Sequence, residues 1–296
     1  MSRVIKLLVG KPWGLSLSSG KRTIIELLNL VVSTSTFLSI NAALVTVFSF
    51  LIYGVEVRPV IFLISFLATF SVYNMNRATD KAEDSINRPD AAIKGSHFYL
   101  VLSLTALLLC LALSVSVGVK TISVLAVPLI ASIAYSVKLR PSFPRLKDII
   151  GVKSIVVAFS WGFTGTFLPC TVYTINFTEK ILVFVYVFIQ IFVNTVLCDV
   201  RDINGDRATG IKTLPIVLGL DRVKSLLLAV NSLLFPWLAI CIVNRLFLEY
   251  LPALIFGTVY GYILILVFTN NGRSRLLTDL AIDGEWIPLL ALMKLL

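Results

Sequence analysis

The chain has 296 residues, of which 57% are hydrophobic and 14% are charged, and its mean hydropathy is +0.93. A soluble domain carries roughly 25% charged residues, so this composition excludes a single soluble globule, a disordered chain and a disulfide scaffold. The net charge of +10 does not indicate a nucleic-acid partner, because the basic residues stand between apolar segments. We therefore predict an integral membrane protein.

The first 26 residues precede the long apolar segments. Their short apolar run is interrupted by Lys6 and followed by Lys11, Lys21 and Arg22, so it lacks the uncharged core of a secretory signal. We expect residues 1–26 to form a basic segment at the membrane surface.

Nine apolar segments follow this basic stretch. Charge-free stretches of about 17 residues or more can cross the hydrocarbon core of a bilayer. Eight segments meet this criterion, whereas the ninth carries Asp279, Asp283 and Glu285 in its first half and is expected to span at a tilt, to insert partly or to lie at the interface. The expected spans lie near 27–55, 59–76, 95–119, 121–137, 154–178, 181–198, 225–244, 250–272 and 276–296.

These spans predict an all-α fold, a polytopic transmembrane helix bundle that forms one domain over residues 1–296. The joins at Arg58 and Lys120 are so short that the spans beside them should form antiparallel hairpins. Most of the 26 Lys and Arg residues fall in the N-terminal segment and in the loops after the second, fourth, sixth and eighth spans. By the positive-inside rule, we expect these loops and the N-terminus on the cytoplasmic side.

Acidic residues gather after the second span, on the side expected to be cytoplasmic. Asn76, Asp80 and Asp84 are spaced four residues apart. This spacing places them on one face of a helix that continues the second span.

A second acidic group follows the sixth span. Asp199, Asp202 and Asp206 stand at positions i, i+3 and i+7, which again share one helix face. The chain therefore contains two similar carboxylate-bearing helix ends, which indicates an internal pseudo-repeat.

Stacked carboxylates repel one another unless a cation lies among them, and charges inside a bilayer are costly. A hydrated central cavity that opens to the cytoplasmic side and holds Mg²⁺ meets both constraints, because Mg²⁺ binds carboxylate and phosphate oxygens. Basic residues between the acids would then meet an anion such as diphosphate; they are Arg77, Lys81, Arg207 and Lys212. The alternative is that both groups are ordinary solvated span ends, which their matched spacing disfavours.

A third basic loop follows the fourth span and contains Tyr135, Ser136, Lys138 and Arg140. These residues either anchor the loop at the membrane surface or turn into the same cavity mouth. Small and hydroxyl-bearing residues in the first and fifth spans, such as Ser160, either line the cavity or pack helices against one another.

The first acidic motif resembles the UbiA superfamily of intramembrane prenyltransferases. Asn76, Asp80 and Asp84 are similar to the Asn-x-x-x-Asp-x-x-x-Asp motif of that superfamily. Asn87-Arg88-Pro89 is similar to the Asn-Arg-Pro that follows the motif.

The second motif extends the resemblance over nearly the whole chain. Asp202 and Asp206 resemble the Asp-x-x-x-Asp motif of the superfamily, within a closely similar run from Gly205 to Pro215. Tyr135-Ser136 resembles the Tyr-Ser before its basic third loop.

The resemblance implies the Mg²⁺-dependent transfer of a polyprenyl group from a polyprenyl diphosphate to a lipophilic or aromatic acceptor. Metal and basic residues would stabilise the departing diphosphate while the C1–O bond ionises to an allylic cation, and an apolar cavity would exclude water. A quinone precursor or a prenylglyceryl phosphate is the expected acceptor. Membrane lipid is an expected partner, whereas nucleic acid and an obligate protein partner are not.

The resemblance also implies roles for individual residues. The expected ligands of two Mg²⁺ ions that bridge the diphosphate are Asn76, Asp80, Asp84, Asp199, Asp202 and Asp206. The expected diphosphate contacts are Arg77, Lys81, Ser136, Lys138, Arg140, Arg207 and Lys212. Asp80, Asp84, Asp202 and Asp206 are thereby expected to be catalytic, and Tyr135 to face the cation or the leaving group.

Two other functions fit parts of the sequence. A CDP-alcohol phosphotransferase also uses Mg²⁺ and aspartates near a bilayer surface, but it carries its acids in one compact motif. A cation-coupled transporter also has repeats and intramembrane carboxylates, but its acids should lie near the midplane rather than at one face. The split of the acids between two distant loops disfavours the first, and their position at the span ends disfavours the second.

Overall fold

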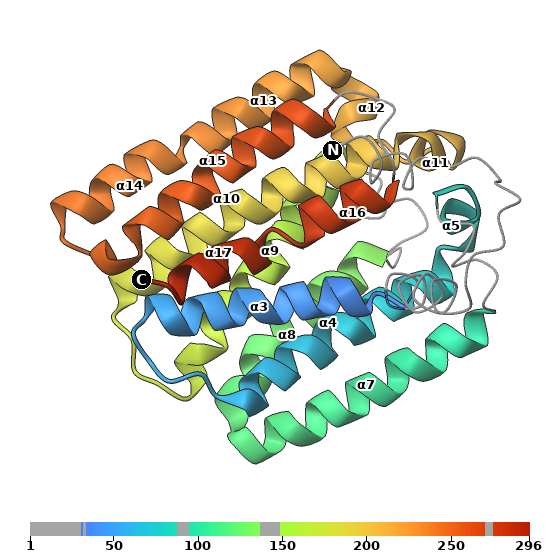
Figure 1. The fold of residues 1–296 in the computed structure, drawn as a ribbon. Helices are drawn as coiled ribbons and strands as arrows, with labels where there is room; N and C mark the ends of the chain where they lie inside the picture. The colour runs from blue at the N-terminus through green and yellow to red at the C-terminus, as the bar shows by residue number, and fades with distance from the viewer. Residues whose placement is uncertain (1–30, 32–33, 88–94, 137–148, 270–274) are drawn as a thin grey trace, which may run out of the picture.

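A computed structural model describes residues 31, 34–87, 95–136, 149–269 and 275–296, with side chains described except at 81–83, 132–136 and 275–277. Within these ranges every regular element is helical, which confirms the predicted all-α class. The helices lie roughly alongside one another in a bundle (Figure 1). The expected N-terminal segment 1–26 and the start of the first expected span lie outside the described residues.

The described helices follow one another in the order expected from the apolar segments. In the first half they are α3 (Thr36–Ile52), α4 (Pro59–Thr79), α5 (Lys81–Asn87), α7 (Ser96–Val117), α8 (Val119–Ser136) and α9 (Val152–Phe167). In the second half they are α10 (Phe177–Arg201), α11 (Ile203–Ala208), α12 (Leu214–Leu218), α13 (Leu220–Ser232), α14 (Leu234–Val243), α15 (Leu251–Phe268), α16 (Arg275–Asp283) and α17 (Trp286–Met293). Two 3-10 turns, Pro169–Thr171 and Leu248–Tyr250, lie before α10 and α15.

Five helical stretches among the described residues are long and apolar enough to cross a membrane. They are Pro59–Thr79, Ser96–Val117, Phe177–Arg201, Leu220–Val243 and Leu248–Phe268. Thr36–Ile52 and Val119–Ala131 are apolar but shorter. These stretches support a multi-pass protein, while the expected total of nine spans stays a prediction.

Prolines explain most of the differences between expected and observed helix ends. The fifth expected span runs to residue 178, but α9 ends at Phe167 and a 3-10 turn begins at Pro169, which lacks the N–H that would continue the helix. Pro236 and Pro288 lie in the first turns of α14 and α17. A proline is tolerated in a first turn, because no intrahelical bond needs its missing N–H there, but it does not continue a preceding helix. The expected spans 225–244 and 276–296 are therefore each two helices separated by a break.

Helix α10 is the centre of the second half of the bundle, where it packs against α9, α13, α15 and α16. Its Tyr186 is fully buried and stacks on Phe48 of α3 with ring centroids 5.6 Å apart. Phe48 also meets Trp286 of α17 edge to face at 5.2 Å. Aromatic pairs of this geometry stabilise packing beyond the buried area alone, so α3, α10 and α17 form one rigid seam.

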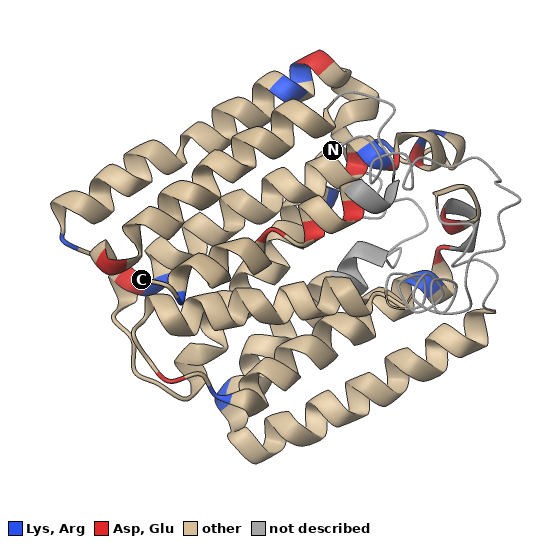
Figure 2. Cartoon of the chain, in the orientation of Figure 1, with Lys and Arg blue, Asp and Glu red and all other residues tan. Residues whose placement is uncertain are grey.

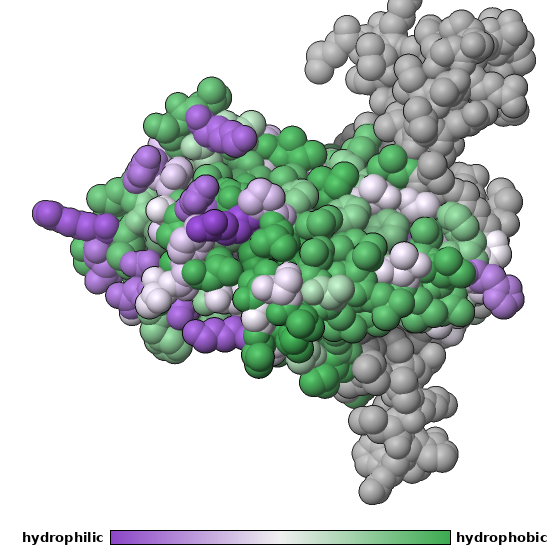
Figure 3. Space-filling model, turned by 90° about the horizontal axis from the view of Figure 1, so that it is seen from below, coloured by the Kyte–Doolittle hydropathy of each residue, from purple (hydrophilic) through white to green (hydrophobic). Residues whose placement is uncertain are grey.

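The outer surface of the bundle is apolar. Large hydrophobic side chains such as Leu108, Val115 and Val243 are more than 60% exposed, which water disfavours and lipid does not. Figure 2 shows charged residues near the helix ends and along α16 and its junction with α17, with the middles of the other long helices free of them. In Figure 3 hydrophobic residues cover the centre of the visible face, and hydrophilic residues gather toward one end.

Gly257 lets α15 pack closely against α10 and α17. A methyl group there would overlap the Tyr186 hydroxyl and lie 2.7 Å from Leu289 Cδ1. We predict that Gly257→Ala lowers the unfolding free energy in detergent by about 1–3 kcal/mol, because the added carbon overpacks a rigid interface. Gly162→Ala is the matched control, since its added carbon would lie 3.4 Å from Phe184 Cε2, an ordinary contact. Equal melting temperatures for the two variants would contradict the prediction.

Candidate functional site

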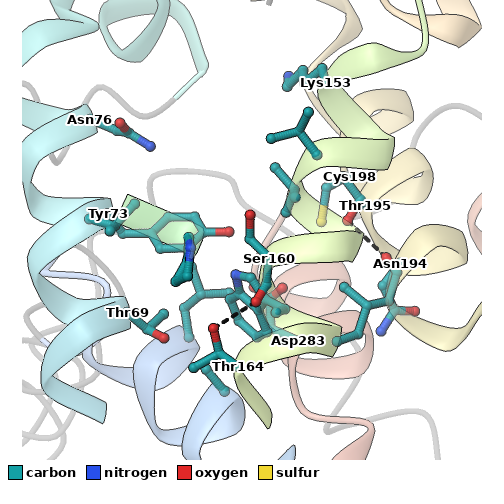
Figure 4. A pocket seen from close by; sticks show the side chains of 18 of the residues that line it. Thr69, Tyr73, Asn76, Lys153, Ser160, Thr164, Asn194, Thr195, Cys198 and Asp283 are labelled. Atoms are coloured by element: carbon teal, nitrogen blue, oxygen red, sulfur yellow. Dashed lines mark hydrogen bonds between the residues drawn. The ribbon is translucent and has the colours of Figure 1, made fainter. Parts of the chain in front are cut away.

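A cavity of ≈ 300 Å³ opens between the helices that carry the two acidic motifs. Residues of α4 and α5 line one side, residues of α9, α10 and α11 line the other, and Leu38 and Trp286 contribute from α3 and α17. In Figure 4, Thr69, Tyr73 and Asn76 of α4 face Lys153, Asn194, Thr195 and Cys198 across this space.

The first motif lies at a bend rather than on one continuous helix. Helix α4 ends at Thr79, and Asp80 leaves the helical conformation with φ −96° and ψ 40° before α5 begins. The backbone N–H of Asp80 still donates to the Asn76 carbonyl at 2.8 Å, and that of Asp84 donates to the Asp80 carbonyl at 3.0 Å. Asn76, Asp80 and Asp84 all line the cavity, although the expected single helix through all three is interrupted at Asp80.

Arg77 neutralises part of this motif. Its Nη1 lies 3.7 Å from Asp84 Oδ2, and its Nε donates to Ser35 Oγ at 2.8 Å. The side chain of Arg77 is only 8% exposed, so its charge acts on the cavity with little screening by water.

The second motif is more deeply buried. Asp199 of α10 and Asp206 of α11 are each 2% exposed. The ammonium group of Lys153, in the first turn of α9, lies 2.8 Å from Asp199 Oδ1 and 3.5 Å from Asp206 Oδ2. Ser154 Oγ donates to Asp199 Oδ2 at 2.9 Å. Lys153 thus joins two carboxylates that repel each other.

Arg201 holds the third carboxylate of this motif. Its Nε and Nη2 donate to the two oxygens of Asp202 at 3.1 and 2.7 Å. Its Nη1 donates to Asp279 Oδ1 of α16. A guanidinium group that binds both oxygens of a carboxylate fixes its orientation.

The two motifs meet through Asn87 and Gly205. The backbone N–H of Gly205 in α11 donates to Asn87 Oδ1 at 3.1 Å, and α5 packs against α11. A Cβ atom at residue 205 would overlap the Asn87 amide. Glycine is therefore required for the two acidic segments to approach this closely.

Several residues expected from the sequence are not part of the described cavity wall. Arg207 and Lys212 are exposed and do not line it. The side chains of Lys81, Tyr135 and Ser136 are not among those described. Lys138 and Arg140 lie outside the described residues.

Sequence reasoning missed other residues that do line the cavity. Arg201 lines it but was counted only toward the membrane topology, although it stands directly before Asp202. Lys153 also lines it; it belongs to the third basic loop, whose basic residues were expected either to anchor the loop or to turn into the cavity mouth. Asp283 also lines the cavity, and its signal was an acid inside an otherwise apolar segment. Of the small and hydroxyl residues, Ser160 lines the cavity, whereas Ser39 is fully buried and donates to the Ser35 carbonyl.

The donor set of the cavity fits Mg²⁺, because carboxylate and amide oxygens are hard ligands. Among the described residues, no three Asp, Glu, His or Cys side chains converge closely enough to hold a metal ion. Asp84, Asp199, Asp202 and Asp206 are each paired with Arg or Lys instead. Any metal must therefore compete with these cations for the carboxylates.

These features define a multi-pass helical membrane protein in which two separate aspartate motifs meet at one cavity. Residues 42–277 match the UbiA prenyltransferase family, and the chain belongs to this family. The resemblance drawn from the motifs is thus confirmed, and with it an integral membrane location.

Individual relatives support the same placement. The chain is 29% identical over 160 residues to a digeranylgeranylglyceryl phosphate synthase of Natronomonas pharaonis, and 30% identical over 179 residues to one of Haloquadratum walsbyi. These matches cover 53% and 57% of this chain, and span 55% and 60% of the length of those relatives.

Solved structures share the fold. A UbiA homolog from Archaeoglobus fulgidus bound to GPP and Mg²⁺ is similar with a TM-score of 0.68 at 15% identity, over 90% of this chain and 96% of that one. A structure of digeranylgeranylglyceryl phosphate synthase is similar with a TM-score of 0.59, also at 15% identity, and with the same coverage of the two chains.

Substitutions at Asn87 and Gly205 test whether ligand binding requires the close approach of α5 and α11. We predict that Gly205→Ala weakens Mg²⁺-dependent binding of geranylgeranyl thiodiphosphate at least about tenfold, because the new methyl group pushes α5 away from α11. Titration calorimetry in detergent would measure this binding. In an Asn87→Ala background the methyl group has room, so Gly205→Ala should then weaken binding much less. Additive effects of the two substitutions would argue against the contact.

Proposed function

We propose that this chain is an intramembrane prenyltransferase that moves a polyprenyl group from a polyprenyl diphosphate to a prenylglyceryl phosphate. The observation that carries the proposal is the meeting of two distant aspartate motifs at one cavity whose remaining wall is largely apolar. A charged mouth suits the diphosphate, and an apolar wall suits the isoprenoid chain. Membership of the UbiA prenyltransferase family supports the reaction class.

The charge of the cavity favours a divalent cation. The described lining residues include six acidic side chains and three basic ones. A diphosphate is itself an anion, so it would be repelled unless cations entered with it. We propose that Asn76, Asp80 and Asp84 on one side, and Asp199, Asp202 and Asp206 on the other, hold two Mg²⁺ ions. When bound, Mg²⁺ supplies Lewis-acid neutralisation of the leaving diphosphate.

The residues of the chain have separate tasks in this scheme. Arg77 and Lys153 bring positive charge to the leaving group, in addition to any contact from Lys81, Ser136, Lys138 and Arg140. Tyr73 and Trp161 line the cavity with their rings edge to face, 5.8 Å apart. Their aromatic faces would stabilise an allylic cation, and the apolar wall would keep water from it.

The acceptor half of the proposal rests on the curated relatives, which are named for digeranylgeranylglyceryl phosphate. The acceptor hydroxyl oxygen forms a bond to C1 of the prenyl chain, and its proton passes to the released diphosphate. The C1–O bond to diphosphate breaks, and the electron pair leaves with the diphosphate. We further propose that 1–296 is one domain of nine spans, with the N-terminus and the acidic loops on the cytoplasmic side.

We predict that Asp80→Asn and Asp202→Asn each reduce prenyl transfer at least about 100-fold, because each removes a charge that offsets the bound cation. Transfer of radiolabelled geranylgeranyl diphosphate by purified protein, with Mg²⁺ and then with EDTA, measures this. Asp221→Asn is the matched control, since Asp221 is exposed in α13 and does not line the cavity. Normal turnover in either motif variant would overturn the metal assignment. Ion uptake by proteoliposomes without any product would favour a transporter.

We predict that geranylgeranylglyceryl phosphate accepts the prenyl group with a kcat/KM at least about tenfold above that of 4-hydroxybenzoate. A site whose polar groups bind the glycerol hydroxyl and the phosphate of this lipid leaves those groups unpaired when a small aromatic acid binds instead. Mass spectrometry of the lipid product from parallel reactions would decide between the acceptors. A preference for the aromatic acid would move the proposal to a quinone precursor.

A further inference from the structure

Arg201 is a buried cation shared by two carboxylates from different parts of the chain. It is the last residue of α10, and its side chain is only 7% exposed. It binds both oxygens of Asp202 and also donates to Asp279 Oδ1. Asp279 is itself buried, with its side chain 4% exposed.

Asp279 reaches the site from the C-terminal end of the chain. It lies on α16, which packs against α10, and beyond residues 42–277 that match the family. A buried aspartate is costly unless it is paired. Its pairing with Arg201 offsets this cost, and it links the last pair of helices to the second acidic motif.

The geometry sets a conflict at Asp202. Both oxygens of this carboxylate accept hydrogen bonds from Arg201, so a cation that binds the remaining lone pairs competes with the guanidinium group for the same negative charge and weakens that pairing. A buried guanidinium group that loses its counterion is strongly destabilised. Within the described residues, Asp279 is the other carboxylate that pairs with Arg201.

We propose that Asp279 is a positioning residue that keeps Arg201 paired when Asp202 turns to the Mg²⁺–diphosphate complex. The inference rests on the proposed function, in which Asp202 is a metal ligand. Asp279 does not touch the substrate; it acts through Arg201. Without its charge, Arg201 holds Asp202 more tightly and competes with the cation.

The test compares cation binding in full-length Asp279→Asn and wild-type protein in detergent. Mn²⁺ serves as the probe, with geranylgeranyl thiodiphosphate present, and electron paramagnetic resonance reports free Mn²⁺. We expect the Kd for Mn²⁺ to rise about tenfold or more, as for other residues that support metal ligands. The Mg²⁺ concentration for half-maximal transfer should rise in parallel, with kcat at saturating Mg²⁺ much less affected.

Three further variants separate this role from a structural one. Asp279→Glu keeps the charge and should keep Mn²⁺ affinity near the wild-type value. The double variant Arg201→Gln/Asp279→Asn removes the competing cation together with its partner, and should recover Mn²⁺ affinity relative to Asp279→Asn. Asp221→Asn controls for the loss of one acid outside the cavity, and melting temperatures verify that each variant is folded.

The outcomes are distinct. Unchanged Mn²⁺ affinity in folded Asp279→Asn overturns the inference, and so does a double variant that binds no better than Asp279→Asn. If wild-type protein binds neither Mn²⁺ nor the thiodiphosphate, the proposed function itself fails. A lower melting temperature for Asp279→Asn with recovery in neither Asp279→Glu nor the double variant would show that Asp279 is only structural.

Discussion

The structure depends on pairing buried carboxylates with buried cations inside an apolar bundle. Asp199 and Asp206 are almost fully buried, and two such anions would repel each other strongly where water is scarce. Lys153 lies between them and thereby ties α9, α10 and α11 together at the mouth of the cavity. Under the proposed function, a bound cation would compete with these same ion pairs for the carboxylates. Stability and ligand binding would then act on the same few side chains.

Backbone breaks bring these pairs together. Asp80 lies between α4 and α5, and Asp202 lies between α10 and α11. A short helix follows each break, and the two short helices meet at Asn87 and Gly205. Straight continuations of α4 and α10 would carry the last acid of each motif away from the bundle. The bends are thus what converts two similar sequence motifs into one site.

The long helices and the shared face of the first acidic motif could be predicted from the sequence, because hydropathy and residue spacing are local signals. Spans such as 59–76 and 181–198 lie within α4 and α10, and the spacing of Asn76, Asp80 and Asp84 indicated a shared face. Helix breaks caused by Pro236 and Pro288 were missed, since a proline in a long apolar run still leaves enough hydropathy to cross a membrane. The partners of the acids were missed for a different reason. A pairing such as Arg201 with Asp279 joins residues far apart in the chain, and no local pattern predicts it.

The acidic residues of the last apolar segment also face partners that lie elsewhere in the chain. Asp279, Asp283 and Glu285 weakened that segment as a simple span, yet Asp279 pairs with Arg201 and Asp283 lines the cavity. Charge at these positions is costly in lipid but is offset where it faces cations within the protein. The break between α16 and α17 has a related effect, because it separates the acidic helix from the apolar one that packs on α3 and α15. The C-terminal helices therefore join the charged mouth of the cavity to its apolar core.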